Sequence, residues 1–376
     1  YDNVEQDVYG PTGAWKARPS GFTKTGPGTL KFTNQYNNQT GDCEIREGTV
    51  IFQSTAPGNS AGTVFGSVTV AHSLSVRTGA TMVDEDANLG YYYAALHDAN
   101  PAGERLKLAV RLDGGKLLLR NVKEAANEKG CCWLYGPFVF RNGGCIEYDD
   151  PLGGNVYGQI AMTAVTVEDA ETAAVHEIPK NPDSAANQNL YLYDTNLVFN
   201  IADSSHDSRV DLKVGLNPMV RLAAAYVADG GFIKRGAGTL SFNGPAAATY
   251  ASAPRGTVNV EAGTLLVDAA WDFHQLAGLV VSSGAAIGGA GAVSTLTLAA
   301  GANLAATLGQ AKGLSVSAGK VTLPASGTVV LNVPADMTDE QLEEAKSVTV
   351  LEAVDGLEGA ANIANWTISI PGREDK

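Results

Sequence analysis

Hydrophobic and polar residues alternate over short stretches of the chain, and glycine-containing turns separate these stretches. In the stretch "GPGTLKFTN", Leu30 and Phe32 alternate with Thr29 and Lys31. A period of two residues indicates a β-strand with one buried face. A second strand of the same kind follows at residues 47–53, "EGTVIFQ". The pattern therefore predicts a unit of turn, short strand, polar spacer, second turn and second strand.

The same unit occurs again 210 residues further along the chain. The stretch "GFTKTGPGTLKFTN" at residues 21–34 aligns with "GFIKRGAGTLSFNG" at residues 231–244, and "AGTLLVD" supplies the next strand from residue 262. Repetition of a short β unit is typical of a solenoid, because one coil buries its inner face only when a neighbour stacks on it. The motif comprises Gly21, Lys24, Gly26, Gly28, Thr29 and Leu30 in the first copy, and Gly231, Lys234, Gly236, Gly238, Thr239, Leu240, Gly263, Thr264 and Leu265 in the second.

The C-terminal third repeats its hydrophobic pairs at a nearly constant distance. Pairs of the form apolar-x-apolar begin at residues 279, 296, 314, 331, 348 and 366, which are 17 or 18 residues apart. Segments rich in Gly, Ala and Ser fill the intervals. Short strands at a near-constant spacing predict stacked coils with a period of about 17 residues. The expected fold class is all-β, an elongated parallel β-helix, or β-solenoid.

One segment of this third predicts a helix. In "MTDEQLEEAKS", Thr338 and Gln341 have the spacing of a capping box, acidic residues fill the first turn, and Lys346 lies near the end. We expect a single short helix near residues 339–346.

The middle of the chain is less repetitive and allows two interpretations. Apolar alternations are joined at Asp113-Gly114 and at Asn142-Gly143, which are strong hairpin dipeptides. These glycines can form antiparallel hairpins that project from the solenoid, or tight corners between coils, which we favour slightly. The expected division of the chain is an irregular N-terminal segment at 1–20 that caps the first coil or pairs with a neighbouring subunit, coils at 21–83, the less regular β region at 84–229, and coils again at 230–376.

Charge and cysteine content narrow the classes of function. The net charge of −14 argues against a nucleic-acid partner, which requires a basic surface. No apolar run approaches the ~20 residues that span a membrane. The chain begins at Tyr1 without a basic-then-apolar leader, as expected for a processed or truncated piece. Four cysteines permit two disulfides, which we favour over a zinc site because the cysteine spacing fits no usual ligand pattern; buried free thiols stay open as a further alternative. The four are Cys43, Cys131, Cys132 and Cys145.

The phrase "GGFIKRGAGTLSFNG…TYASAPRGTVNVEAGTLLV" resembles the autotransporter-associated β-strand repeat, also called the passenger-associated transport repeat. The usual form starts with Gly-hydrophobic-x-Lys-x-Gly-x-Gly-Thr-Leu, continues through a spacer with a tyrosine, here Tyr250, and closes with Gly-Thr-Leu. The resemblance implies a bacterial secreted or surface-displayed protein whose parallel β-helix is right-handed. The repeat carries no catalytic residues, so the resemblance implies no active site.

Some residue clusters have the composition of catalytic or calcium sites, but each has a plainer interpretation. Ser205, His206 and Asp207 are the residue types of a hydrolase triad, yet neighbours along a strand point to opposite faces, which favours a polar loop. Asp84, Asp86 and Asn88 match the first half of a calcium loop that lacks its glycine and its closing glutamate. The histidines are scattered, so no metal or cofactor is expected.

Polysaccharide chemistry is the remaining enzymatic alternative. It requires two converging carboxylates beside a groove, for which the candidates are Glu147, Asp149 and Asp150, or Asp203, Asp207 and Asp211 with Arg209. A carbohydrate could also stack on the tyrosines Tyr91, Tyr92, Tyr93, Tyr191 and Tyr193, although core or ladder positions are commoner for such residues.

The expected function is a non-enzymatic extracellular structural or adhesive surface protein that assembles into a fibre. The expected partners are further copies of the chain, as a homo-oligomer or filament, or host or matrix glycans, with no nucleic acid and no membrane span. A polysaccharide-active or glycan-binding parallel β-helix protein is the alternative.

Overall fold

The structure is a computed structural model that describes residues 21–33, 41–53, 63–65, 72–85, 88–89, 108–120, 131–149, 157–178, 189–191, 197–206, 210–215, 217–219, 231–242, 256–268, 272–273, 278–333, 337–338, 340–341 and 348–370. The chain forms two compact units. The first comprises residues 1–140, 144–162 and 183–188, and the second comprises residues 141–143, 163–182 and 189–376.

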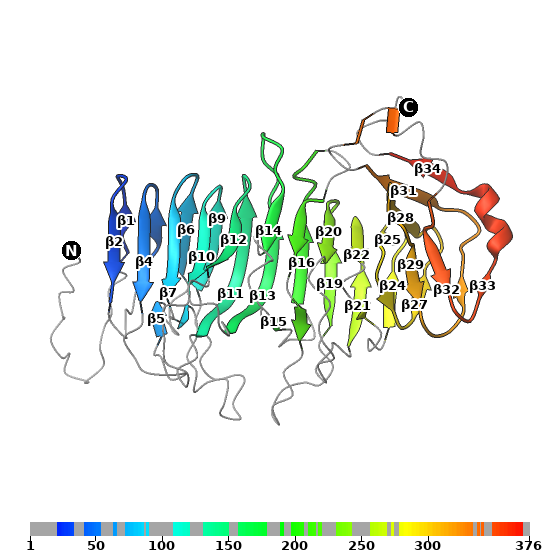
Figure 1. Ribbon diagram of the computed structural model, residues 1–376, viewed down its shortest axis with the longest axis horizontal. Coiled ribbons are helices and arrows are strands. Elements are labelled where there is room, and N and C mark those ends of the chain that lie inside the picture. The colour runs from blue at the N-terminus through cyan, green and yellow to red at the C-terminus, as the bar shows by residue number, and fades with distance from the viewer. Residues whose placement is uncertain are drawn as a thin grey trace, which may run out of the picture. The chain divides into compact units, whose positions relative to one another are not determined.

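The first unit is built from short parallel strands that stack in two sheets (Figure 1). One sheet has the order β1 (Thr23–Lys24), β3 (Cys43–Ile45), β6 (His72–Arg77), β9 (Leu108–Asp113) and β11 (Cys131–Arg141). The other has the order β2 (Thr29–Phe32), β4 (Thr49–Gln53), β7 (Thr81–Glu85), β10 (Lys116–Arg120) and β12 (Cys145–Asp149). Two further strands, β5 (Thr63–Phe65) and β8 (Asn88–Leu89), pair beside β11.

The second unit repeats this plan and adds a third face. The first sheet runs through β13 (Tyr157–Val167), β16 (Leu197–Ile201), β19 (Phe232–Arg235), β21 (Thr257–Val260), β24 (Gly278–Val281) and β27 (Leu296–Leu298). The second runs through β14 (His176–Ile178), β17 (Leu212–Val214), β20 (Thr239–Phe242), β22 (Thr264–Val267), β25 (Ala286–Gly288), β28 (Asn303–Thr307), β31 (Thr328–Asn332) and β34 (Thr367–Ser369). The added strands are β23 (Asp272–Phe273), β26 (Ala292–Val293), β29 (Leu314–Val316) and β32 (Leu351–Ala353), the pair β30 (Val321–Thr322) and β33 (Leu357–Glu358), and the pair β15 (Asn189–Tyr191) and β18 (Asn217–Met219).

Parallel ladders between successive coils make this chain a parallel β-helix, as the sequence predicts. The alternation of the sequence decides which side chains enter the core. In β4, for example, Val50 and Phe52 are buried and their neighbours are partly exposed. Equivalent side chains of successive coils then stack on one another: the rings of Phe32 and Phe52 lie 5.2 Å apart and nearly parallel.

The two hairpin dipeptides of the middle region form corners between coils. Strands β9 and β10 flank Asp113-Gly114 but belong to different sheets, and β10 pairs in parallel with β7 and β12. Strands β11 and β12 flank Asn142-Gly143 in the same way. Gly114, Asn142 and Gly143 have φ values of 68°, 52° and 77°, the left-handed conformation that lets the chain turn sharply. The hairpin interpretation is therefore wrong at both places.

The predicted spacing of 17 residues holds for one pair of neighbouring coils, those of β24 and β27. Leu279 of β24 pairs with Leu296 of β27, 17 residues later. The later pairs of the series lie on different faces: Leu314 belongs to β29, Leu331 belongs to β31, and residue 348 lies outside the strands. Coils of the C-terminal third differ in length, since Leu304 pairs with Val329. A uniform 17-residue coil is therefore wrong, because a coil with several faces places successive apolar pairs on different sheets.

The predicted helix is described only at its start. Residues 340 and 341 are helical, and the rest of 339–346 lies outside the described residues. The capping box is present: the Thr338 backbone N–H donates to Gln341 Oε1 at 2.9 Å, and the Gln341 N–H donates to Thr338 Oγ1 at 3.2 Å. The sequence pattern did not reveal a 3₁₀ helix, η2 (Ala360–Asn365), which follows Gly359 in a left-handed conformation.

Candidate functional site

The lysine of the second repeat copy is buried and holds two coils together. Lys234 lies in β19 with no exposed surface, although lysine is rarely buried. Its Nζ donates hydrogen bonds to the carbonyl oxygens of Arg235, Gly236 and Ala262, at 2.9, 2.8 and 3.0 Å. The first two acceptors belong to its own turn, and the third belongs to the turn of the next coil. We call this arrangement the lysine cage.

The first copy contains the same cage. Lys24 Nζ donates to the carbonyl oxygens of Thr25, Gly26 and Glu47, at 3.0, 2.5 and 3.1 Å. The acceptors again lie one and two residues after the lysine and in the following coil. Glu47 adds a contact of its own, because its carboxylate accepts the Gly26 N–H at 2.9 Å. The lysine of the motif therefore has one structural role in both copies.

The glycines of the motif allow the two turns to touch. Gly48 and Gly263 close the second turn of each copy in a left-handed conformation, with φ values of 70° and 66°. A Cβ at Gly263 would overlap the carbonyl oxygens of Gly236 and Gly238, and a Cβ at Gly48 would lie 2.5 and 2.6 Å from those of Gly28 and Gly26. Other motif glycines also pack against backbone: a Cβ at Gly21 would overlap the Asp42 carbonyl, and one at Gly231 the Thr257 carbonyl.

The threonine and leucine of the motif complete the contact between the coils. The Thr49 N–H donates to the Gly28 carbonyl and the Thr264 N–H to the Gly238 carbonyl, both at 3.2 Å. Leu240 and Leu265 pair in register and are fully buried. In the first copy, Thr29 pairs with Thr49 in register.

A buried carboxylate supports the second cage from the preceding coil. Asp211 accepts the backbone N–H of Thr239 at 2.6 Å and that of Ser205 at 2.7 Å. Burial raises the pKa of Asp211, and these two hydrogen bonds oppose the rise. Burial likewise lowers the pKa of Lys234 to about 7, against the attraction of the Asp211 carboxylate. Lys234 and Asp211 thus both form hydrogen bonds with backbone atoms of the turns.

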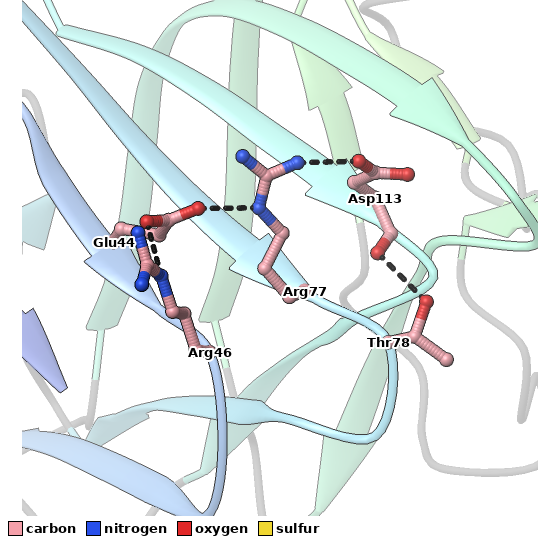
Figure 2. Close-up of polar contacts among 5 residues, drawn as sticks. All are labelled: Glu44, Arg46, Arg77, Thr78 and Asp113. Carbon is pink, nitrogen blue, oxygen red and sulfur yellow. Dashed lines mark hydrogen bonds and ion pairs between the residues drawn. The ribbon is translucent and has the colours of Figure 1, made fainter. Parts of the chain in front are cut away.

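Charged side chains on the outer faces form ladders across the coils of the first unit. Figure 2 shows Arg77 between two acidic residues: its Nε donates to Glu44 at 2.6 Å and its Nη1 donates to Asp113 at 2.6 Å. Glu44 also accepts a hydrogen bond from Arg46 Nε at 2.7 Å. The hydrogen bonds from Arg46 and Arg77 lower the pKa of Glu44. The ladder therefore links β3, β6 and β9.

The carboxylates proposed for polysaccharide chemistry belong to a second ladder. Glu147 pairs with Lys116 at 2.9 Å, and Asp149 pairs with Arg120 at 2.8 Å. Arg120 also contacts Glu85 at 3.4 Å. Asp150 lies outside the described residues. Glu147 and Asp149 thus neutralise basic residues of the neighbouring coil.

The Ser205-His206 stretch does not assemble a triad. Ser205 is buried, and its backbone N–H donates a hydrogen bond to Asp211. His206 is exposed instead, and its Nε2 lies 2.5 Å from Asp169 Oδ1. Asp203 accepts the His206 backbone N–H at 3.1 Å. Asp207 lies outside the described residues, as does Arg209. The sequence gives no indication of the His206–Asp169 pair, because 37 residues separate its members.

This pair predicts a measurable titration. The hydrogen bond that the His206 imidazole donates to the Asp169 carboxylate raises the pKa of His206 above its ordinary 6.5. A raised pKa stabilises the folded state below the unfolded pKa, and this contribution is lost as pH rises through the folded pKa. We expect Asp169→Asn to lower the pKa of His206, measured by NMR titration of the imidazole resonances. Glu171→Gln, an exposed neighbour, is the control, and an unchanged His206 pKa in Asp169→Asn would contradict the pairing.

The structure describes some of the remaining candidate residues and does not describe the others. Asp84 lies in β7 and is fully buried, so this residue belongs to a strand and does not stand in an exposed loop. Asp86 lies outside the described residues. The same is true of Tyr91, Tyr92, Tyr93 and Tyr193, and of the side chain of Tyr191.

The disulfides stay a prediction. Cys43 and Cys145 are buried, in β3 and β12, and Cys43 Sγ lies 3.6 Å from the Gly41 carbonyl oxygen. The side chains of Cys131 and Cys132 lie outside those described.

Within the described residues, no group of three or more His, Cys, Asp or Glu side chains could hold a metal ion. No helix in the described part of the chain has the length and apolar character needed to cross a membrane.

The two segments that match a known protein family are the segments that contain the two lysine cages. No curated protein and no solved structure matches the chain significantly. Residues 22–51 and 232–267 each match the family described as the Passenger-associated-transport-repeat. These two segments contain Lys24 with Glu47 and Lys234 with Ala262, so each match includes one complete cage. Such repeats belong to autotransporter passenger domains, which are secreted or surface-exposed. The chain is therefore a parallel β-helix protein that carries two passenger-associated transport repeats, a repeat of secreted or surface-exposed passenger domains.

Proposed function

We propose that the chain is a non-enzymatic structural protein of the cell surface or extracellular space, which serves as part of a stalk or fibre. One observation carries this proposal: the residues that define the repeat are used to join one coil to the next. Lys24 and Lys234 satisfy carbonyls of two turns each, and the motif glycines permit those turns to meet.

The charged residues of the outer faces support the same role. A polysaccharide-active site needs carboxylates that converge on a substrate and stay available to it. Glu147 and Asp149 are instead paired with the basic residues of β10, and Asp211 is bound to backbone N–H groups. These contacts add stability between coils, each worth about 1 kcal/mol or less where the pair is exposed.

The test is an assay for polysaccharide cleavage by the full chain. The protein is incubated with a panel of acidic and neutral polysaccharides, and released reducing ends and unsaturated products are measured beside a known lyase. We expect no product above that of the heat-denatured protein. Retention of a glycan without cleavage would identify an adhesive form of the structural role. Product release by the native protein would contradict the proposal.

A further inference from the structure

Two neighbouring corners of the second unit are longer than those that follow, and they contact each other. Corner A comprises residues 168–175, between β13 and β14, and corner B follows β16 and is described over residues 202–206. Residues 236–238, by comparison, are enough to join β19 to β20. The Ala174 N–H of corner A donates to the Ser204 carbonyl oxygen of corner B at 2.8 Å. Ser204 Oγ donates in return to the Ala174 carbonyl oxygen at 2.9 Å.

The side chain of His206 reaches from corner B to corner A, and each partner is held by its own corner. His206 has a φ of 55°, a left-handed conformation that histidine adopts more often than most residues. Asp203 Oδ1 supports this conformation, because it accepts the His206 backbone N–H at 3.1 Å. On corner A, Asp169 Oδ1 accepts the Ala170 N–H at 2.7 Å and lies 2.5 Å from His206 Nε2. The geometry of the contact is therefore set by the backbone of both corners.

The described charged groups that act on the imidazole are acidic. The hydrogen bond to Asp169 has the largest effect and raises the pKa of His206, against a partial loss of hydration. The negative charges of Asp169, Asp203 and Asp211 raise it further. The next charged residues of the chain, Asp207 and Arg209, lie outside the described residues.

Asp169 lies between a permanent positive charge and one that titrates. The hydrogen bond with His206 lowers the pKa of Asp169, and the charge of Arg141, the last residue of β11, lowers it too. Asp169 therefore stays ionised over the range in which His206 titrates. In the ladder of the first unit, by contrast, the basic member is Arg77, which keeps its charge at every physiological pH.

We propose that His206 and Asp169 form a pH-sensitive latch, which ties corner B to corner A at acidic pH and releases it when the imidazole loses its proton. The protonated imidazole donates a charge-assisted hydrogen bond to the carboxylate, which is about twice as strong as a neutral one. Because the pair raises the pKa of His206 in the folded state, its contribution is complete below the unfolded pKa of about 6.5. The contribution is lost as the pH rises through the folded pKa.

The latch acts on local opening of the two corners. An exposed ion pair contributes little to the free energy of global unfolding. Local opening of a surface segment breaks far fewer contacts, so the same pair changes its equilibrium measurably. The hydrogen bonds between Ala174 and Ser204 lie in the same two corners and report on this opening. The latch is independent of the proposed structural role.

The experiment measures hydrogen exchange of the Ala174 N–H in the full chain, from about pH 5.5 to about pH 8. Each rate is divided by the intrinsic rate at the same pH, which gives the protection of this amide. We expect protection to fall by roughly two- to fivefold across the range, with its midpoint at the pKa of His206 measured by NMR. The Ala299 N–H, which donates to the Val281 carbonyl oxygen, is the internal control, because residues 278–302 contain no charged residue and no histidine.

Three variants separate the latch from other effects of pH. His206→Asn removes the titrating group and keeps a residue type that tolerates the left-handed conformation. We expect its Ala174 protection to be independent of pH and equal to that of the native protein at about pH 8. Asp169→Asn is expected to give the same result. Glu171→Gln changes an exposed carboxylate of corner A and is expected to keep the native pH dependence.

Two results would overturn the latch. One is equal protection of Ala174 at every pH in the native protein, a result that needs no variant to fold. The other is a pH dependence that survives in His206→Asn, because a different group of the corners would then titrate. Circular dichroism confirms that each variant is folded. Either result would leave the structural role intact, because only polysaccharide cleavage contradicts that role.

Discussion

Replacement of Lys234 by methionine is expected to destabilise the second unit by about 3 kcal/mol. Methionine fills a similar volume but donates no hydrogen bond, so the carbonyls of Arg235, Gly236 and Ala262 lose their donor inside the protein. A buried carbonyl without a donor costs about 1–3 kcal/mol, and part of this cost is relieved by local rearrangement. The midpoint of urea unfolding, followed by far-UV circular dichroism, measures the loss.

Lys24→Met is the matched control, because Lys24 makes the same three kinds of contact in the first copy. Lys24 is partly exposed, so water can replace its hydrogen bonds to the carbonyls. We expect a loss of about 1 kcal/mol or less for this variant. Equal losses for the two lysines, or no loss for Lys234→Met, would contradict the importance of the buried cage.

Gly263→Ala is expected to destabilise the protein by about 3 kcal/mol or more, for a steric reason. The added methyl group would overlap the carbonyl oxygens of Gly236 and Gly238 and would lie 2.7 Å from Lys234 Nζ. The neighbouring turn is backbone held by the cage, so it can move only by breaking hydrogen bonds. The residue also has a φ of 66°, which alanine adopts with strain.

A second variant, Gly284→Ala, separates the steric overlap from the backbone strain. Gly284 has a φ of 79°, close to that of Gly263, but a Cβ there would meet no atom within 4 Å. Only the backbone strain remains, and we expect a loss of about 1 kcal/mol. Urea unfolding of both variants gives the comparison, and a Gly263→Ala protein as stable as Gly284→Ala would refute the overlap of the turns.

The fold class could be predicted from the sequence because strand alternation and glycine turns are local. The pattern identified the motif residues, including Lys24 and Lys234, and the capping box at Thr338. It could not decide between hairpins and corners at Asp113-Gly114, since two alternating strands joined by a turn look alike in both. Only the pairing partners of β9 and β10 distinguish the two arrangements.

The roles of the motif residues depended on contacts between coils. The third acceptor of Lys234 lies 28 residues later, at Ala262, and the contact is made to its backbone carbonyl, so its side chain does not reveal it. No pattern of residue types marks such a partner. The same holds for Asp211, which the sequence suggested as a candidate acid and the structure uses to bind two backbone N–H groups.

The lysine cage also determines where this β-helix can be divided. Each cage takes its donor from one coil and its last acceptor from the next, so the two coils form one exchangeable module. A chimera joined between residues 242 and 256 would give Lys234 a foreign turn in place of Ala262, whereas a junction after residue 268 would transfer the module complete. Shortening or lengthening this protein by recombination therefore has to proceed in pairs of coils at the repeats.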